Sequence, residues 1–192
     1  MKHGDKNTKK FHSKATQRRR KNHIKGIKNA EGQWVEEIEN VVAVASDYFH
    51  TLFHASAGDQ MEKCLDAVPS RVIEDMLMVL SSEFTAEEVK VALFQMGPIK
   101  APGPDGMNAF FYKNFWHIVG DDVVFAVLDF LNNDHMLLEI NHSNIVLIPK
   151  VKVPKKKSDF RAICLCNVIY KIVAKVLANK LKQVLPHIIS PT

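Results

Sequence analysis

The pattern of apolar positions along the chain predicts a mainly helical protein. After Gly32, apolar residues recur at helical spacing through "WVEEIENVVAVASDYFHTLF", at Val35, Ile38, Val42, Ala45, Phe49 and Leu52. This spacing predicts an amphipathic helix that packs through one face. A shorter helix is expected at about 72–80, where apolar residues again cluster.

The segment "FTAEEVKVALFQMGP" carries a complete set of helix signals. Thr85 and Glu88 are spaced as a capping box, and Phe84 and Val89 as a hydrophobic staple across the first turn. The apolar face then carries Val89, Leu93 and Met96. The helix is expected to end at Gly97-Pro98, because proline lacks a backbone donor and restricts the residue before it.

The C-terminal half predicts more helices and one β-hairpin. Two helices are expected at 109–119 and 121–132, separated at Gly120 with Asp121 as a cap. "NIVLIPK" predicts a mostly buried strand, "VKVPKKKSD" a basic loop and "FRAICLC" a second strand. Asn167 is expected to cap a long helix that ends before Pro186 and carries Ile169, Ile172, Val176, Leu181 and Leu185 on one face. The predicted fold class is α+β, mainly helical.

Composition and length fit a protein with a sizeable core. The chain has 192 residues, of which 46% are hydrophobic. No apolar run approaches the roughly 20 residues of a membrane span, and residues 1–28 lack the apolar centre of a secretory signal. We therefore expect an intracellular protein, in the nucleus or cytoplasm, with no membrane partner. The three cysteines lack the spacing of a zinc site.

Charge is segregated along the chain. Residues 1–28 hold 11 Lys/Arg and 1 Asp/Glu, residues 29–140 hold 5 and 19, and residues 141–192 hold 10 and 1. Basic ends of this kind bind polyanions by displacing counterions from phosphates. They are equally compatible with simple solvation, so charge alone leaves both interpretations open.

The hairpin and the loop before residue 109 carry the candidate site residues. Five cations would project from the hairpin and could close over phosphates: Lys150, Lys155, Lys156, Lys157 and Arg161. A lysine-rich solvated loop or a nuclear import signal would have the same sequence pattern. In "IKAPGPDGMN", Asp105 is a lone carboxylate in a turn, which favours a plain loop, and no second acid stands beside it to hold a metal.

Ordered motifs resemble a known family over nearly the whole chain. "FTAEEVKVALFQMGPIKAPGPDGMNAFFYKNFW", "IVLIPK" and "SDFRAICLCNVIYKIVAKVLANKLKQVLPHIIS" resemble, in that order, the reverse transcriptase of plant non-LTR, LINE-type retrotransposons. "GDKNTKKFHSKATQRRRKNHI" resembles the linker that joins this region to an upstream endonuclease. The resemblance implies a fragment of an RNA-directed DNA polymerase, with incomplete fingers, one β-hairpin and a basic N-terminal extension.

The resemblance also implies roles for particular residues. Lys150 and Arg161 match positions expected to contact the nucleotide, and Arg18, Arg19, Arg20 and Lys21 would lie along the RNA template or DNA primer strand. The family's first polymerase motif corresponds to Lys100, Gly103, Pro104, Asp105 and Gly106, which would be more structural than catalytic. The implied domains are a basic linker at 1–32, a helical region at 33–97 and a partial reverse transcriptase domain at 98–192.

Catalysis is not expected from these residues alone. The complete family enzyme uses Mg²⁺ and deoxynucleotide triphosphates, and its metal-binding aspartates correspond to positions beyond Thr192. We therefore expect no catalytic residue, no metal site and no cofactor in this chain. A non-catalytic module that binds RNA or single-stranded DNA, or an unstable pseudogene product, remains the alternative.

Overall fold

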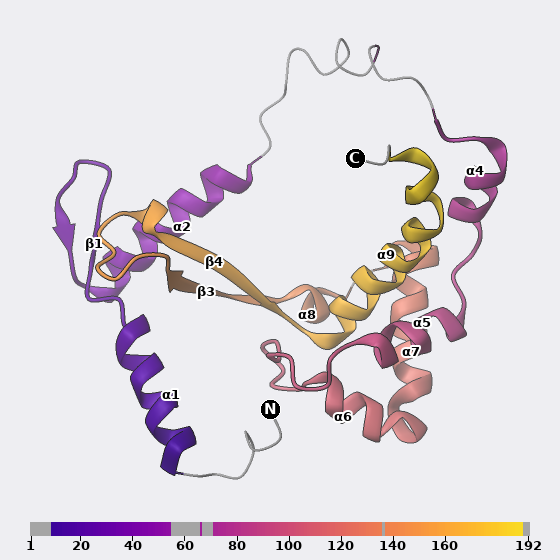
Figure 1. Cartoon of the computed structure of the whole chain (residues 1–192), viewed down its shortest axis with the longest axis horizontal. Coiled ribbons are helices and arrows are strands. Elements are labelled where there is room, and N and C mark those ends of the chain that lie inside the picture. The colour runs from indigo at the N-terminus through magenta and orange to yellow at the C-terminus, as the bar shows by residue number, and fades with distance from the viewer. Residues whose placement is uncertain (1–8, 55–65, 67–70, 136, 190–192) are drawn as a thin grey trace. The chain divides into compact units, whose positions relative to one another are not determined.

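The computed structural model describes residues 9–54, 66, 71–135 and 137–189. The chain forms two compact units, the first from residues 1–57 and 145–163 and the second from residues 58–144 and 164–192 (Figure 1). The described residues form eight α-helices and two two-stranded antiparallel sheets. The predicted class, α+β and mainly helical, is confirmed. The described residues include no helix long and apolar enough to span a membrane.

The first unit joins the N-terminal segment to the distal part of the hairpin. Its elements are α1 (Lys9–Asn22), β1 (Ile27–Lys28), β2 (Trp34–Val35), α2 (Ile38–Phe53), and the distal parts of β3 (Ser143–Pro149) and β4 (Phe160–Cys166), with the 3-10 turn η1 (Lys157–Asp159) between these strands. β1 and β2 pair antiparallel, with Ile27 opposite Val35. Ile27, Val41 and Phe160 form the buried core of this unit.

Two expectations for the first unit are wrong in detail. The amphipathic helix begins at Ile38, because Val35 lies in β2 and packs against the core from there. The strand "NIVLIPK" was expected to be mostly buried, but Ile145 is 54% exposed. The hairpin has two strands, so the described residues cover only part of each strand face.

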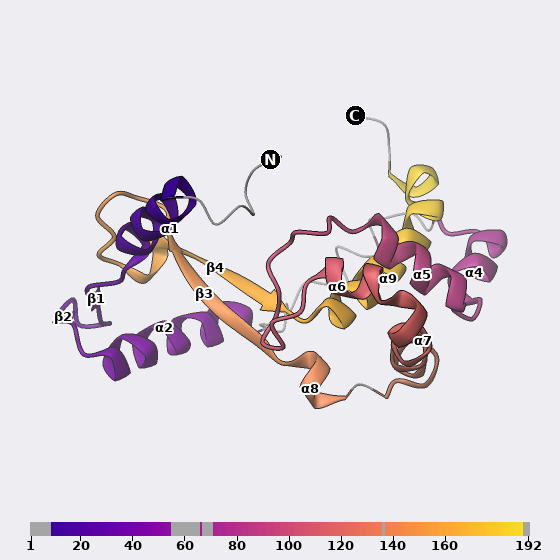
Figure 2. The ribbon, with the colours of Figure 1, turned by 90° about the horizontal axis from the view of Figure 1, so that it is seen from below.

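The second unit is a helical cluster (Figure 2). Its elements are α4 (Glu74–Ser81), α5 (Ala86–Gln95), α6 (Ala109–Asn114), α7 (Trp116–Asn133), α8 (Leu138–Asn141) and α9 (Val168–Ile188). α5, α7 and α9 pack on one another around a common core that includes Val89, Leu93, Val127 and Ile172. The short helix expected at 72–80 is present as α4.

The predicted capping box and C-terminal end of α5 are confirmed. The Thr85 backbone N–H donates to the Glu88 carboxylate at 2.8 Å, and the Glu88 N–H donates to the Thr85 hydroxyl at 3.4 Å, which closes the capping box. Phe84 packs against the core that contains Val89. Leu93 and Met96 are buried, and the helix ends at Gln95, just before Gly97.

The expected break between two helices at Gly120 is wrong. The chain bends at Phe115 instead, and α7 runs through Gly120. A β-carbon on Gly120 would lie 2.9 Å from the Trp116 ring, so this glycine makes room for the indole within the helix. The glycine thus serves packing and does not terminate the helix.

α9 differs from expectation in its second half. It continues past Pro186 to Ile188, because a proline in the last turn removes only one backbone hydrogen bond. Lys180 and Val184 are the buried positions of its second half, whereas Leu181 and Leu185 are exposed. Lys180 Nζ donates to the Ser82 carbonyl and lies 3.7 Å from the centroid of the Phe84 ring. The carbonyl and the ring face together stabilise this buried cation.

Candidate nucleic-acid interface

The tip of the β3–β4 hairpin is ordered by one aspartate. The Asp159 carboxylate accepts hydrogen bonds from the backbone N–H groups of Lys155 and Lys156, both at 2.9 Å. The backbone carbonyl of Asp159 accepts a hydrogen bond from the Lys150 N–H at 2.7 Å. Together these bonds hold the ends of the lysine-rich loop in a fixed turn. The same backbone bonds, helped by the charges of Lys156 and Lys150, hold the pKa of Asp159 below its ordinary value.

The turn is anchored to the rest of the first unit by its neighbours. Phe160, which follows Asp159, is 2% exposed and packs with Ile27 and Val41. The Lys28 N–H donates to the Lys155 carbonyl at 2.9 Å, so β1 is tied to the hairpin tip. These two contacts fix the cationic loop against the N-terminal segment.

Four of the five predicted hairpin cations, Lys150 and Lys155 to Lys157, lie in the turn between the strands, and Arg161 is the second residue of β4. Lys155, Lys156 and Arg161 are exposed. Lys150 Nζ donates to the Ser158 carbonyl at 2.9 Å, and Lys157 Nζ lies 5.5 Å from the centroid of the Tyr48 ring on α2. The side chains thus form a cationic end of the hairpin. Their contact with nucleotide phosphates stays a prediction.

The fold also collects positive charge in the first unit. Residues 1–57 and 145–163 carry 17 Lys/Arg and 7 Asp/Glu, a net charge of +10, while the second unit carries 9 and 14, a net charge of −5. Arg18, Arg19, Arg20 and Lys21 are exposed in the last turns of α1. The basic N-terminus and the basic hairpin, far apart in sequence, therefore belong to the same compact unit.

The loop from Lys100 to Gly106 belongs to the second unit, between α5 and α6. Lys100 and Pro104 are exposed, and Gly106 has a φ of 71°, the left-handed region that favours glycine. The Asp105 carboxylate accepts the Met107 N–H at 3.0 Å and bonds the Tyr112 hydroxyl. This aspartate therefore orders its own turn, as expected for a structural residue.

Tyr112 is the titratable group most changed by this loop. Its burial, together with the nearby Asp105 charge and the hydrogen bond to that carboxylate, raises the pKa of Tyr112 to about 12. The hydroxyl is therefore a proton donor to Asp105 throughout the neutral range.

Asn167 is a connecting residue whose role the sequence did not reveal. It occupies the cap position of α9, but its side chain makes no cap bond, contrary to expectation. The side-chain oxygen accepts the Asp105 N–H at 3.3 Å, and the side-chain nitrogen donates to the Glu139 carbonyl at 3.0 Å. A β-carbon on Gly103 would lie 2.3 Å from that oxygen, so the loop and the start of α9 are in close contact. The Lys171 ammonium adds a bond to the Ala101 carbonyl at 2.8 Å.

Within the described ranges, no three His, Cys, Asp or Glu side chains come together as a metal site.

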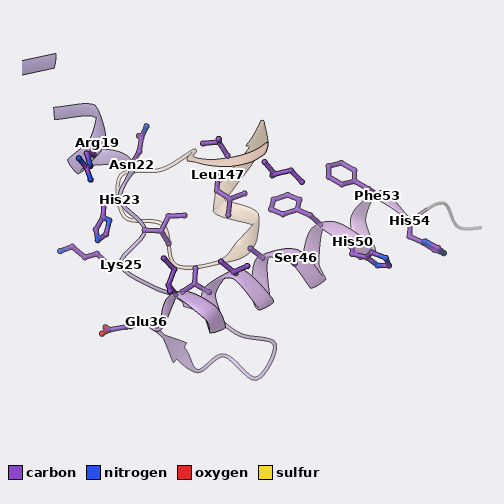
Figure 3. Close-up of a pocket in the computed structure, with 18 residues that line it drawn as sticks. Arg19, Asn22, His23, Lys25, Glu36, Ser46, His50, Phe53, His54 and Leu147 are labelled. Atoms are coloured by element: carbon purple, nitrogen blue, oxygen red, sulfur yellow. The ribbon is translucent and has the colours of Figure 1, made fainter. Parts of the chain in front are cut away.

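A groove of about 1130 Å³ lies in the first unit along α2, with Arg19 and Lys25 among its lining residues (Figure 3). The exposed apolar positions of α2 were the available signal for it, but they were interpreted as a packing face. Neither Lys150 nor Arg161 lines this groove.

Comparison with known proteins gives an informative similarity. The chain is 28% identical over 163 residues to the transposon TX1 uncharacterized 149 kDa protein of Xenopus laevis. The chain is related to a transposon-encoded protein. The matched region is 84% of this chain and 12% of the relative, so the chain spans a small part of that relative's length. No protein-family model matches the chain.

Proposed function

We propose that the chain is part of a reverse transcriptase of a non-LTR, LINE-type retrotransposon and contributes nucleotide and template contacts. Three observations support this proposal. The chain carries the family's motifs in order, from "KAPGPDG" through "IVLIPK" to "SDFRAICLC". It is related to a transposon-encoded protein. The hairpin that bears Lys150 and Arg161 ends in a turn fixed by Asp159.

The fixed turn is the observation that carries the proposal. Lysine and arginine side chains have high conformational entropy, so binding a triphosphate is less costly when the backbone beneath them is already ordered. Asp159 provides this order through backbone bonds, without forming a close ion pair that would occupy the exposed Lys155 or Arg161. In this proposal Arg161 offers a planar fork to phosphate oxygens, and the lysines act as point charges.

Catalysis is not part of the proposed role of these residues alone. The aspartates that hold Mg²⁺ in the family match no position in this sequence, and two-metal phosphoryl transfer depends on such ligands. Primer extension on an oligo(dT)-primed poly(rA) template, with Mg²⁺ or Mn²⁺, should give no incorporation above the protein-free reaction. Incorporation by the purified chain that persists after repurification would refute this part of the proposal.

The net charge of the first unit favours a second candidate, binding of RNA or single-stranded DNA without catalysis. The affinity for a dT oligonucleotide should fall with salt, with a log–log slope of roughly −0.7 for each phosphate neutralised. Replacing Lys155, Lys156 and Lys157 with glutamine should reduce that slope by about 2, the sum for three contacts. The matched control replaces three lysines of the second unit, Lys90, Lys175 and Lys182, with glutamine.

The two triple variants separate local contact from net charge, because each removes three positive charges. Equal slopes for the two variants would show that the hairpin makes no phosphate contact. A slope near zero for the unmodified chain would refute nucleic-acid binding altogether.

A further inference from the structure

The groove in the first unit has an apolar floor that the described residues leave uncovered. It runs along one face of α2, with β3 as the opposite wall (Figure 3). Its apolar lining includes Ile38, Val42, Ala45 and Phe53 of α2 with Ile145 and Val146 of β3. Ile38 is 75% exposed and Phe53 is 64% exposed. Uncovered apolar surface of this extent, bordered by polar residues, is typical of an interaction site.

The dimensions and chemistry of the floor fit a helix. α2 has 16 residues, so the face is about 24 Å long at 1.5 Å per residue. Its apolar residues recur every three or four positions, the spacing with which ridges and grooves of two helices interlock. Most of the floor is aliphatic, whereas proteins that bind single-stranded nucleic acids supply flat aromatic rings for base stacking. The floor therefore favours a protein helix over nucleic-acid bases.

The border of the groove is polar, with a small excess of positive charge. Arg19, Lys25 and Glu36 lie toward one end with His23, and His50 and His54 lie near the other end, beside Phe53 (Figure 3). With histidine neutral, two cations face one acidic residue among the described lining residues. The whole unit has a net charge of +10. Such a border attracts an acidic partner and repels a basic one.

We infer that this groove docks an acidic amphipathic α-helix of a partner protein. Leucine-like side chains one turn apart would fill the space between α2 and β3, and carboxylates on the flanks of that helix would face Arg19 and Lys25. This is the helix-in-groove mode of peptide recognition. The inference concerns a protein partner, so it can hold or fail independently of nucleotide and template binding.

The test uses the full chain and a defined probe. The probe is a fluorescein-labelled synthetic helix of about 18 residues, five turns, with leucine every third or fourth position and glutamate elsewhere. Its binding is followed by fluorescence anisotropy. Val42→Asp, which places a carboxylate in the floor that the bound helix would bury, should weaken binding at least tenfold.

Matched variants keep the test specific to the groove. Val153→Asp is the control, because Val153 is also exposed and belongs to the same unit but does not line the groove. Ile38→Asp is a second groove variant, and it should keep the stability of α2 because an acidic residue in the first turn of a helix is favourable. Circular dichroism melts of all variants check folding. Arg19→Glu with Lys25→Glu should also weaken binding at least tenfold.

The outcomes are distinguishable. Binding that is weakened by both groove variants and unaffected by Val153→Asp supports the inference. Equal binding of a probe with lysine in place of glutamate would refute the acidic partner. The inference also fails if the acidic helix does not bind and Val42→Asp instead abolishes binding of a dT oligonucleotide, because the groove would then be a nucleic-acid surface.

Discussion

Replacing Gly103 with alanine tests how the loop from Lys100 to Gly106 is held against α9. A β-carbon at this position would lie 2.3 Å from the Asn167 side-chain oxygen and 2.4 Å from the Asn167 backbone nitrogen. The backbone nitrogen cannot rotate away as a side chain could, so the loop must move off the start of α9. Overpacking of this kind costs typically 1–3 kcal/mol.

The displaced loop would also lose hydrogen bonds. The bond from the Asp105 N–H to Asn167 is broken when the loop moves, and a typical bond contributes about 1 kcal/mol. The expected loss in the free energy of unfolding of the second unit is therefore about 2–4 kcal/mol. Trp116 reports on this unit during urea unfolding when Trp34, in the first unit, is replaced with phenylalanine.

Gly97→Ala is the matched control for this measurement. A β-carbon there would lie 3.6 Å from the Lys100 side chain, an ordinary contact with a flexible group. Its effect should stay within about 0.5 kcal/mol. If the two alanine variants have equal stability, the close contact between the loop and α9 does not exist in solution and the reasoning is wrong.

Three further predictions concern titratable side chains. The pKa of Tyr112 is raised in the folded state, so the contribution of this proton to stability is complete below pH 10 and is lost as pH rises toward about 12. Tyr112→Phe should remove this pH dependence from the urea concentration at the midpoint of unfolding. The pKa of Asp159 is lowered in the folded state, so its contribution is present above the ordinary value of 3.8 and is lost as pH falls through the folded value. Asp159→Asn should accordingly speed amide hydrogen exchange at Lys155 and Lys156 at neutral pH, and unchanged exchange would contradict the role given to the carboxylate. Lys180→Ala should cost about 2 kcal/mol, because it removes the charge-assisted hydrogen bond from this buried ammonium to the Ser82 carbonyl, whereas Lys182→Ala, exposed on the same helix, should be nearly neutral by thermal melting.

Local sequence signals correctly predicted the helix boundaries that are set by interactions between neighbouring residues. The capping box of Thr85 and Glu88 and the Gly97-Pro98 stop depend on residues within a few positions, and α5 has the expected bounds. The hairpin is also present where two apolar runs separated by a basic loop predicted it. In each case the deciding interaction lies within one element.

Errors arose where tertiary packing decided the structure. Gly120 resembles a helix break, but it leaves room for Trp116 inside α7. Leu181 was expected on the apolar face of α9, yet Lys180 is buried instead, where its ammonium contacts the Ser82 carbonyl and the Phe84 ring. These outcomes depend on partners that no spacing rule identifies.

The candidate site shows the same division. The cations of the hairpin were predictable because they are close together in sequence, between Lys150 and Arg161. The function of Asn167 was not, since its partners Asp105 and Glu139 lie 62 and 28 residues away. The groove was missed because its walls come from α2 and β3, and a pattern within α2 alone cannot reveal an opposite wall.

The burial of Ile27 and Val41 against Phe160 has a consequence for how the protein is made. During translation the basic N-terminal segment emerges long before Phe160, so these two apolar side chains lack their cover until more than 100 further residues have been added. Contacts so distant in sequence close slowly. A nascent chain arrested before the hairpin would expose both cationic and apolar surface, which makes it a natural client for ribosome-associated chaperones.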